Sequence, residues 1–105
     1  MGALSVRAKK VDANHAAISA RLRSIGWFVS DSSGVGRGYP DLTVSRLGHT
    51  ALVEVKHGKG ELNELQRKFR DKWQGAYFVV RSPDDAERQL NLWLLTQAPL
   101  TGNPG

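Results

Sequence analysis

The chain has 105 residues, a formal net charge of +5 and no cysteine. This length predicts a single domain with one modest core. The absence of cysteine excludes disulfides, thiol nucleophiles and cysteine-based zinc sites, and the excess of Lys and Arg favours a polyanionic partner such as nucleic acid. No apolar run approaches the roughly 20 residues of a membrane span, and no signal-peptide pattern is present, so we expect a soluble intracellular protein.

Residues 1–10 carry several cations without apolar periodicity and predict a loose basic N-terminal arm. From residue 11 onward the pattern is that of a helix. Asp12 is expected as its N-cap, and Gly26 stands where a helix-terminating glycine belongs. The apolar residues at helical spacing are Val11, Ile18, Leu22 and Ile25.

Residues 27–31 predict a short first strand, which leads into the glycine-rich segment 32–38. Nucleotide-binding glycine loops run from a strand into a helix, whereas this segment runs into Pro40 and another strand, so we do not expect a nucleotide site. We expect instead a mobile loop that lets a substrate backbone approach Asp41, with Arg37 available for a phosphate. The alternative is a flexible connection without substrate contact.

Residues 42–46 and 50–56 are rich in β-forming side chains and flank a short connection, a pattern that predicts a β-hairpin. The strand period of two places Glu54 and Lys56 on one face of the second strand and the flanking valines on the other. Asp41 opens the first strand, and the hairpin folds it back to lie roughly opposite Glu54 or Lys56. Two carboxylates and one amine are therefore expected to converge.

Mg²⁺ and similar hard cations take oxygen ligands, usually one or two carboxylates together with substrate phosphate. Asp41 and Glu54 fit this ligand role, and Lys56 fits the role of orienting or deprotonating a bound water. Each residue alone is more often a turn residue or part of a solvated strand face. Two charges on one face of so apolar a strand need water or partners, which favours a functional site.

A second helix is expected to start at Asn63 and to end at Gly75. Gln66 follows Asn63 at the spacing of a capping box, which leaves a structural role open beside a role in the site. The apolar stripe of this helix is Leu62, Leu65, Phe69 and Trp73. Its other face is a candidate surface for DNA phosphates, or else an ordinary solvated face, and with the preceding loop it carries Lys59, Arg67, Lys68, Arg70 and Lys72.

Residues 76–81 are almost continuously apolar, as expected of a buried central strand. Ser82 is expected to cap a last helix, with Pro83 at its first position and acids in its first turn. The domain is therefore expected to span residues 11–95, followed by a disordered tail over residues 96–105.

Three segments together resemble the PD-(D/E)XK nuclease superfamily. They are Gly38-Tyr39-Pro40-Asp41-Leu42, Val53-Glu54-Val55-Lys56 and Leu62-Asn63-Glu64-Leu65-Gln66. The pattern is most similar to that of the small standalone virus-type replication-repair nucleases (VRR-NUC), which are similar to Holliday-junction resolvases. A lone Asp…Glu-x-Lys pattern arises often by chance, but the three segments in this order are fairly specific.

The resemblance implies an α/β fold with the restriction-endonuclease-like core α-β-β-β-α-β and an added C-terminal helix. It implies a Mg²⁺- or Mn²⁺-dependent DNA endonuclease of DNA repair or recombination, in the cytoplasm of a bacterial or phage-infected cell. The metal ligands would be Asp41, Glu54 and the carbonyl of Val55, with Lys56 as the catalytic lysine and Gln66 in support. Such proteins tend to act as symmetric homodimers on branched DNA, including four-way junctions.

In many of these enzymes a glutamate on the first helix approaches the metal, and the resemblance implies that Asn14 lies near that position. Two roles are open for Asn14: it positions a metal-bound water, or it satisfies a buried backbone group. His15, on the flank of the same helix, is expected to have no special role.

Two functional alternatives also stay open. One is a non-catalytic nucleic-acid-binding module on the same fold, for which the missing acid at Asn14 leaves room. The other is a restriction-like endonuclease with sequence preference.

Overall fold

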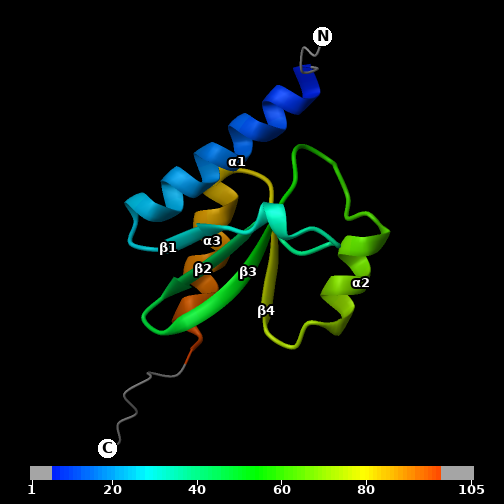
Figure 1. The fold of residues 1–105 in the computed structure, drawn as a ribbon. Coiled ribbons are helices and arrows are strands. Elements are labelled where there is room, and N and C mark those ends of the chain that lie inside the picture. Colours follow the sequence, from blue (N-terminus) through cyan, green and yellow to red (C-terminus); the bar gives the residue numbers. More distant parts are fainter. Residues whose placement is uncertain (1–5, 98–105) are drawn as a thin grey trace, which may run out of the picture.

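The computed structural model describes residues 6–97 of the chain (Figure 1). Its α-helices are α1 (Val6–Ser24), α2 (Glu64–Lys72) and α3 (Pro83–Leu95). The strands are β1 (Phe28–Asp31), β2 (Leu42–Arg46), β3 (His49–Val55) and β4 (Ala76–Val80), and the 3-10 turn η1 (Ser33–Val35) follows β1. Within these residues the predicted order of helix, three strands, helix, strand and helix is confirmed. None of the helices described in this range is long and apolar enough to cross a membrane.

The first helix begins earlier than the sequence pattern predicts. Residues 6–10, predicted as part of a loose arm, belong to α1, and Asp12 lies inside the helix rather than at its N-cap. The physical reason is composition, because Arg, Ala and Lys are strong helix formers and extend a helix without needing an apolar stripe. Residues 1–5 of the predicted arm lie outside the described residues.

The last helix is closed by two residues that were assigned to the tail. The backbone amide of Thr96 donates to the carbonyl of Trp93 at 3.0 Å, and that of Gln97 donates to Leu94 at 3.1 Å. Thr96 is therefore the C-cap of α3, and Gln97 is hydrogen-bonded to the last turn of the helix. The rest of the predicted tail, residues 98–105, lies outside the described residues.

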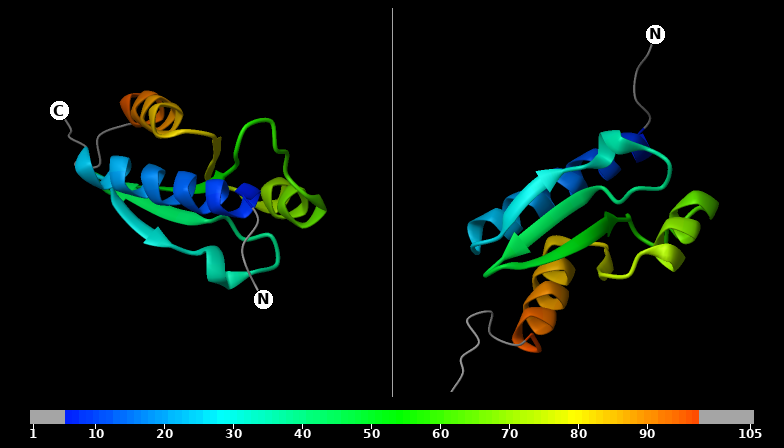
Figure 2. Two further views of the ribbon diagram at one scale, coloured as in Figure 1. Left: turned by 90° about the horizontal axis from the view of Figure 1, so that it is seen from above. Right: turned by 60° about the horizontal axis from the view of Figure 1, so that its bottom comes forward.

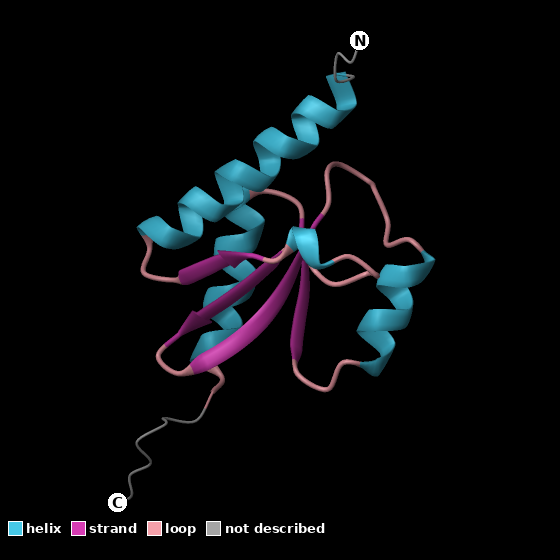
Figure 3. Cartoon of the chain, viewed as in Figure 1, coloured by secondary structure: helices cyan, strands magenta, loops and turns pink. Residues whose placement is uncertain are grey.

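The strands form one sheet in the order β1-β2-β3-β4 (Figure 3). The first three are antiparallel neighbours, and β4 runs parallel to β3 because the chain crosses over through α2. The turn between β2 and β3 consists of Leu47 and Gly48, whose φ values of 52° and 82° are those of a type I′ hairpin turn. The predicted hairpin is thereby confirmed.

The prediction that residues 76–81 form a central strand is wrong. β4 lies at the edge of the sheet and, within the described part of the chain, pairs only with β3. Its apolar character arises because helices cover both of its faces. Phe78 packs against Trp93 of α3, with ring centroids 5.7 Å apart, whereas Tyr77 lies 6.5 Å from Phe69 of α2. An apolar run without alternation thus indicates two covered faces rather than a central position.

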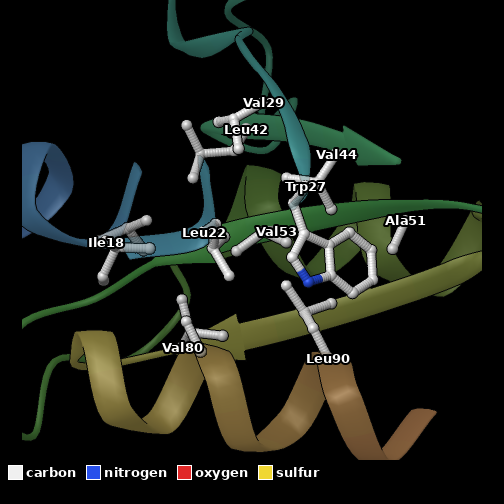
Figure 4. Packing of buried hydrophobic residues seen from close by; sticks show 12 residues of the cluster. Ile18, Leu22, Trp27, Val29, Leu42, Val44, Ala51, Val53, Val80 and Leu90 are labelled. Atoms are coloured by element: carbon white, nitrogen blue, oxygen red, sulfur yellow. The ribbon is translucent and has the colours of Figure 1, made fainter. Parts of the chain in front are cut away.

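The same alternation defines the layers of the fold. Successive residues of β4 point to opposite faces, and they meet α2 on one side and α3 on the other. α1 packs beside α3, so these two helices share one face of the sheet (Figure 2). The main core fills the space between them and the strands (Figure 4), and its buried residues are Ile18, Leu22, Trp27, Val29, Leu42, Val44, Ala51, Val53, Val55, Val80, Ala86 and Leu90.

The glycine-rich segment before Asp41 packs against α2. Gly38 has a φ of +82°, and a Cβ at this position would lie 2.4 Å from the carbonyl oxygen of Leu65. The ring of Tyr39 meets that of Phe69 edge-on, with centroids 5.0 Å apart. The glycine at position 38 is therefore required by the backbone of the protein's own helix, whereas the sequence pattern predicts that it admits a substrate backbone.

Replacing Gly38 by alanine should destabilise the fold by about 2 kcal/mol or more, because the new Cβ overlaps a helix carbonyl in a left-handed backbone conformation. Gly34→Ala is the matched control, since no atom lies within 4 Å of a Cβ at that position. Urea denaturation of both variants measures the difference. Equal midpoints would contradict the close contact between Gly38 and α2.

Candidate active site

The pairing of β2 with β3 brings the two predicted carboxylates together. Leu42 pairs with Val53, so continuing the register by one residue places Asp41 opposite Glu54. Asp41 Oδ2 accepts a hydrogen bond from the backbone amide of Val55 at 2.9 Å. The carboxylate of Asp41 therefore lies beside the end of β3, next to Glu54.

Glu54 is almost completely buried, with 2% of its surface exposed. Its Oε2 accepts a hydrogen bond from Gln66 Nε2 at 2.9 Å, and Lys56 Nζ lies 3.8 Å from the same oxygen. Its Oε1 is buried and has no hydrogen-bond partner among the described residues. A buried carboxylate oxygen without a donor is costly, and a cation, a water or a proton shared with the Asp41 carboxyl would satisfy it.

The protonation of this carboxyl pair follows from its surroundings. Burial, together with the charge of Asp41, raises the pKa of Glu54 from its ordinary value of 4.5 to about 8, although the ammonium of Lys56 lowers it. Near neutral pH the pair therefore favours holding a proton. A divalent cation bound between two such groups would displace that proton, so its affinity would rise with pH.

Gln66 forms the capping box that its spacing from Asn63 predicts, and its side chain also contacts Glu54. Its backbone amide donates to Asn63 Oδ1, and its Oε1 accepts from the backbone amide of Asn63, each at 2.9 Å, which forms the predicted capping box. Its Nε2 donates to Glu54. Because both ends of this amide are engaged, the position of Glu54 is tied to the first turn of α2.

Asn14 binds backbone carbonyls. Its Nδ2 donates to the carbonyl oxygens of Lys56 and Arg81, both at 3.1 Å. These residues directly follow β3 and β4, so the amide ties α1 to the ends of two strands. Of the two roles considered for Asn14, the geometry supports the satisfaction of backbone groups.

Asp41 also lines a surface pocket of about 330 Å³. Helix α1 contributes Asp12 and His15 to this pocket, neither of which the sequence pattern marks as a site residue. They are three residues apart and therefore share a helix face. This spacing could have indicated a shared site, but it applies only if Asp12 lies inside the helix, and the sequence pattern predicted Asp12 as the N-cap. The complete lining is Asp12, His15, Asp31, Ser33, Asp41 and Val55.

Two further polar groups beside the carboxyl pair were not predicted. Ser33 donates to Asp31 Oδ1 from its hydroxyl at 2.6 Å and from its backbone amide at 2.9 Å, and these hydrogen bonds lower the pKa of Asp31. On the α2 side, the hydroxyl of Tyr77 is buried without a hydrogen-bond partner among the described residues. Burial and the charge of Glu54 raise the pKa of Tyr77 to about 12, so this hydroxyl stays protonated.

The donor chemistry of the site fits a hard divalent cation. Among residues 6–97, no three or more side chains of His, Cys, Asp or Glu are arranged to hold a metal ion by themselves. Two carboxylates completed by waters and a substrate phosphate are nevertheless a usual protein contribution to an Mg²⁺ site. Asp41 and Glu54 are a pair of this kind, and their roles as ligands, like that of the Val55 carbonyl, stay predictions.

The predicted phosphate-binding cations fall into two groups. Lys59, Arg67 and Arg70 line a second pocket, beside the β3–α2 loop. The others lie outside its lining: Arg37 is exposed in the β1–β2 connection, Lys68 pairs with Glu64 at 3.6 Å, and Lys72 is exposed near the end of α2.

Comparisons of the chain with protein-family models, with curated proteins and with solved structures found no match. The family indicated by the three motifs therefore stays a prediction. The fold that the described residues show is an α/β fold with a mixed four-stranded sheet and three helices.

The raised pKa of Glu54 predicts how stability depends on pH. The folded state favours the protonated carboxyl, so this contribution is fully present below about pH 4.5 and is lost as pH rises to about 8. Relative to Glu54→Gln, which stays neutral, the metal-free wild type should lose unfolding free energy across this interval. Urea denaturation of both proteins at a series of pH values measures the difference, and parallel pH profiles would contradict the raised pKa.

The hydrogen bonds of Asn14 predict a second effect on stability. Asn14→Ala should cost about 1–3 kcal/mol, because two strand-end carbonyls lose their donor. Asn14→Asp should cost at least as much, since a carboxylate cannot donate and would face those carbonyls. Thermal denaturation tests both variants, with the exposed substitution Ala17→Ser as control. An Asn14→Asp protein as stable as wild type would show that position 14 does not act through these bonds.

Proposed function

We propose that this protein is a divalent-metal-dependent endonuclease that hydrolyses phosphodiester bonds in DNA. The observation that carries the proposal is the cluster of Asp41, Glu54 and Lys56. Two carboxyls from adjacent strands and one amine lie together, and one buried carboxylate oxygen has no partner among the described residues. Carboxylate pairs beside a lysine suit metal-assisted phosphodiester hydrolysis.

The contacts among the three motif segments support the same proposal. Gly38 of the first segment packs on the backbone of α2, and Asp41 binds the Val55 amide of the second. Gln66 of the third segment binds Glu54 of the second. Segments that are far apart in sequence thus meet around one carboxyl pair. The order α-β-β-β-α-β of the elements is also the order that the PD-(D/E)XK resemblance implies.

In the proposed mechanism Asp41 and Glu54 would hold the metal ion, which requires Glu54, whose pKa is raised to about 8, to give up its proton. The chemistry that Mg²⁺ or Mn²⁺ would supply there is stabilisation of charge at the phosphoryl oxygens and a lowered pKa of the attacking water. Lys56, whose ammonium lies 3.8 Å from Glu54, orients the attacking water or neutralises the developing negative charge. Gln66 fixes the orientation of the Glu54 carboxyl by donating to its Oε2.

The preferred substrate that we propose is branched DNA, such as a four-way junction, cut by a homodimer. This part rests on the motif resemblance together with size, because a single chain of 105 residues covers little DNA. A twofold dimer would present two equivalent sites to a junction.

A non-catalytic DNA-binding module is the second candidate. Two features favour it: burial and the charge of Asp41 raise the pKa of Glu54 to about 8, and Asn14 contributes an amide donor to backbone carbonyls where a nuclease often has an acid. The module and the enzyme differ in one measurable property, the cutting of DNA in the presence of Mg²⁺ or Mn²⁺.

Lys56→Ala should reduce cleavage about 100- to 10,000-fold, as expected for loss of a group that transfers a proton or stabilises charge in the transition state. Binding should change little, because only one positive charge of a +5 protein is removed. Cleavage is scored on a four-way junction and on supercoiled plasmid with Mg²⁺ or Mn²⁺, and binding is scored by gel shift in Ca²⁺. Arg88→Ala removes one exposed charge from α3 and is the matched control.

Each outcome of this experiment has a defined meaning. If wild-type protein binds DNA but cuts no form of it with either metal, the binding module is correct. If Lys56→Ala cuts at the wild-type rate, the catalytic role of Lys56 is wrong.

A further inference from the structure

A second pocket, of about 620 Å³, opens between the β3–α2 loop, α2 and β4. Four cations line it, Lys59 from the loop, Arg67 and Arg70 from α2 and Arg81 from the residue after β4, against one acid, Glu61. Gly58, Leu62 and Val79 complete the lining. Such an excess of positive charge in a concave site concentrates anions.

The contacts of the arginines leave most of this charge uncompensated. Arg81 Nη1 donates to the carbonyl oxygens of Gly58 and Gly60, at 2.9 and 2.6 Å, and Arg67 Nη1 donates to the carbonyl of Leu62 at 2.5 Å. Carbonyl acceptors orient a guanidinium without neutralising it. Within the described residues, Arg70 alone of the three arginines has a carboxylate partner, the exposed Asp71.

The same hydrogen bonds hold the pocket in shape. Arg81 bridges two carbonyls of the loop that joins β3 to α2, and the amide of Gly60 donates to the carbonyl of His57 at 3.0 Å. The wall formed by this loop is therefore preformed. A preformed site binds an anion without first losing the entropy of an unordered loop.

The pocket adjoins the candidate active site across one strand. Val79, in its lining, pairs with Glu54 in the register of β3 and β4. On α2 two consecutive residues contact the two sites: Gln66 donates to Glu54 of the carboxyl pair, and Arg67 lines the pocket. The carboxyl pair and the pocket are therefore neighbours along α2, and one nucleic-acid strand could contact both.

We infer that this pocket is a second phosphate subsite, which holds a backbone phosphate of the same DNA strand whose scissile phosphate lies at Asp41 and Glu54. The inference rests on the proposed nuclease function and adds Arg81 to the DNA-contacting residues. It also divides the basic face of α2, because Arg67 and Arg70 contact phosphate in the pocket, whereas Lys68 and Lys72 lie outside the lining and contribute only to the general positive field.

The test compares two double variants that remove the same charge from the same helix. Arg67→Ala/Arg70→Ala should flatten the slope of log K against log [salt] by about one to two units for duplex or junction DNA in Ca²⁺, because phosphate contacts that release counterions are lost. Lys68→Ala/Lys72→Ala should flatten it by a clearly smaller amount. All four residues are exposed on α2, so alanine should leave the fold intact, and thermal denaturation checks this.

A second measurement locates the phosphate itself. Neutral methylphosphonate linkages are placed one at a time along a labelled DNA strand. With wild-type protein, neutralising one particular linkage, at a position other than the cleaved one, should weaken binding. That effect should disappear in Arg67→Ala/Arg70→Ala and persist in Lys68→Ala/Lys72→Ala. The subsite is refuted if the two double variants lose equal slope, or if no linkage depends on the arginine pair.

The failure of this inference is distinguishable from failure of the proposed function. Cleavage that requires Lys56 together with equal slopes for the two double variants would remove the subsite and keep the nuclease. A linkage effect specific to the arginine pair, in a protein that never cuts DNA with Mg²⁺ or Mn²⁺, would keep the subsite and remove the nuclease.

Discussion

The register between β2 and β3 is the constraint on which the candidate site depends. Leu42 and Val44 lie opposite Val53 and Ala51, and all four are buried under α1 and α3. A slip of one residue would turn every side chain of one strand to the other face, which would bury polar groups such as Thr43 in the core. The packing of the apolar face therefore fixes the register, and the same register places Asp41 opposite Glu54 on the other face.

The candidate site lowers the stability of the fold locally, because it buries a carboxyl group. Glu54 has almost no exposed surface, one of its oxygens has no partner among the described residues, and a second carboxylate lies beside it. The bond from Gln66 and the ammonium of Lys56 offset part of the cost of burying the carboxyl. Arrangements of this kind are common where stability is lost in favour of activity.

Local patterns in the sequence predicted most elements of the fold. The capping box of Asn63 and Gln66, the Ser82 cap and the β2–β3 hairpin all follow from residue types at fixed spacing. The start of α1 was not predicted, because residues of high helix propensity can form a helix without an apolar stripe. The edge position of β4 could not be predicted, because an apolar run gives the number of covered faces and says nothing of the number of paired neighbours.

The parts of the site that sequence could not give depend on contacts between distant residues. The donors of Asn14 go to carbonyls 42 and 67 residues away, so its role could not be chosen from helix spacing. Gly38 is required by the backbone of Leu65, which only the packing of α2 brings near. The pairing of Asp41 with Glu54, in contrast, follows from a short hairpin and the period of two, and it was predictable for that reason.

The double engagement of Gln66 has a mechanical consequence. Its amide accepts from Asn63 with one end and donates to Glu54 with the other, so it cannot rotate without breaking both bonds. A ligand that draws the Glu54 carboxyl toward itself must therefore either strip Gln66 from it or pull the first turn of α2 along. Arg67 is the next residue on that turn and forms part of the wall of the basic pocket. As long as the bond from Gln66 to Glu54 is kept, a movement of the Glu54 carboxyl would therefore be transmitted through this side chain to the helix turn that carries Arg67.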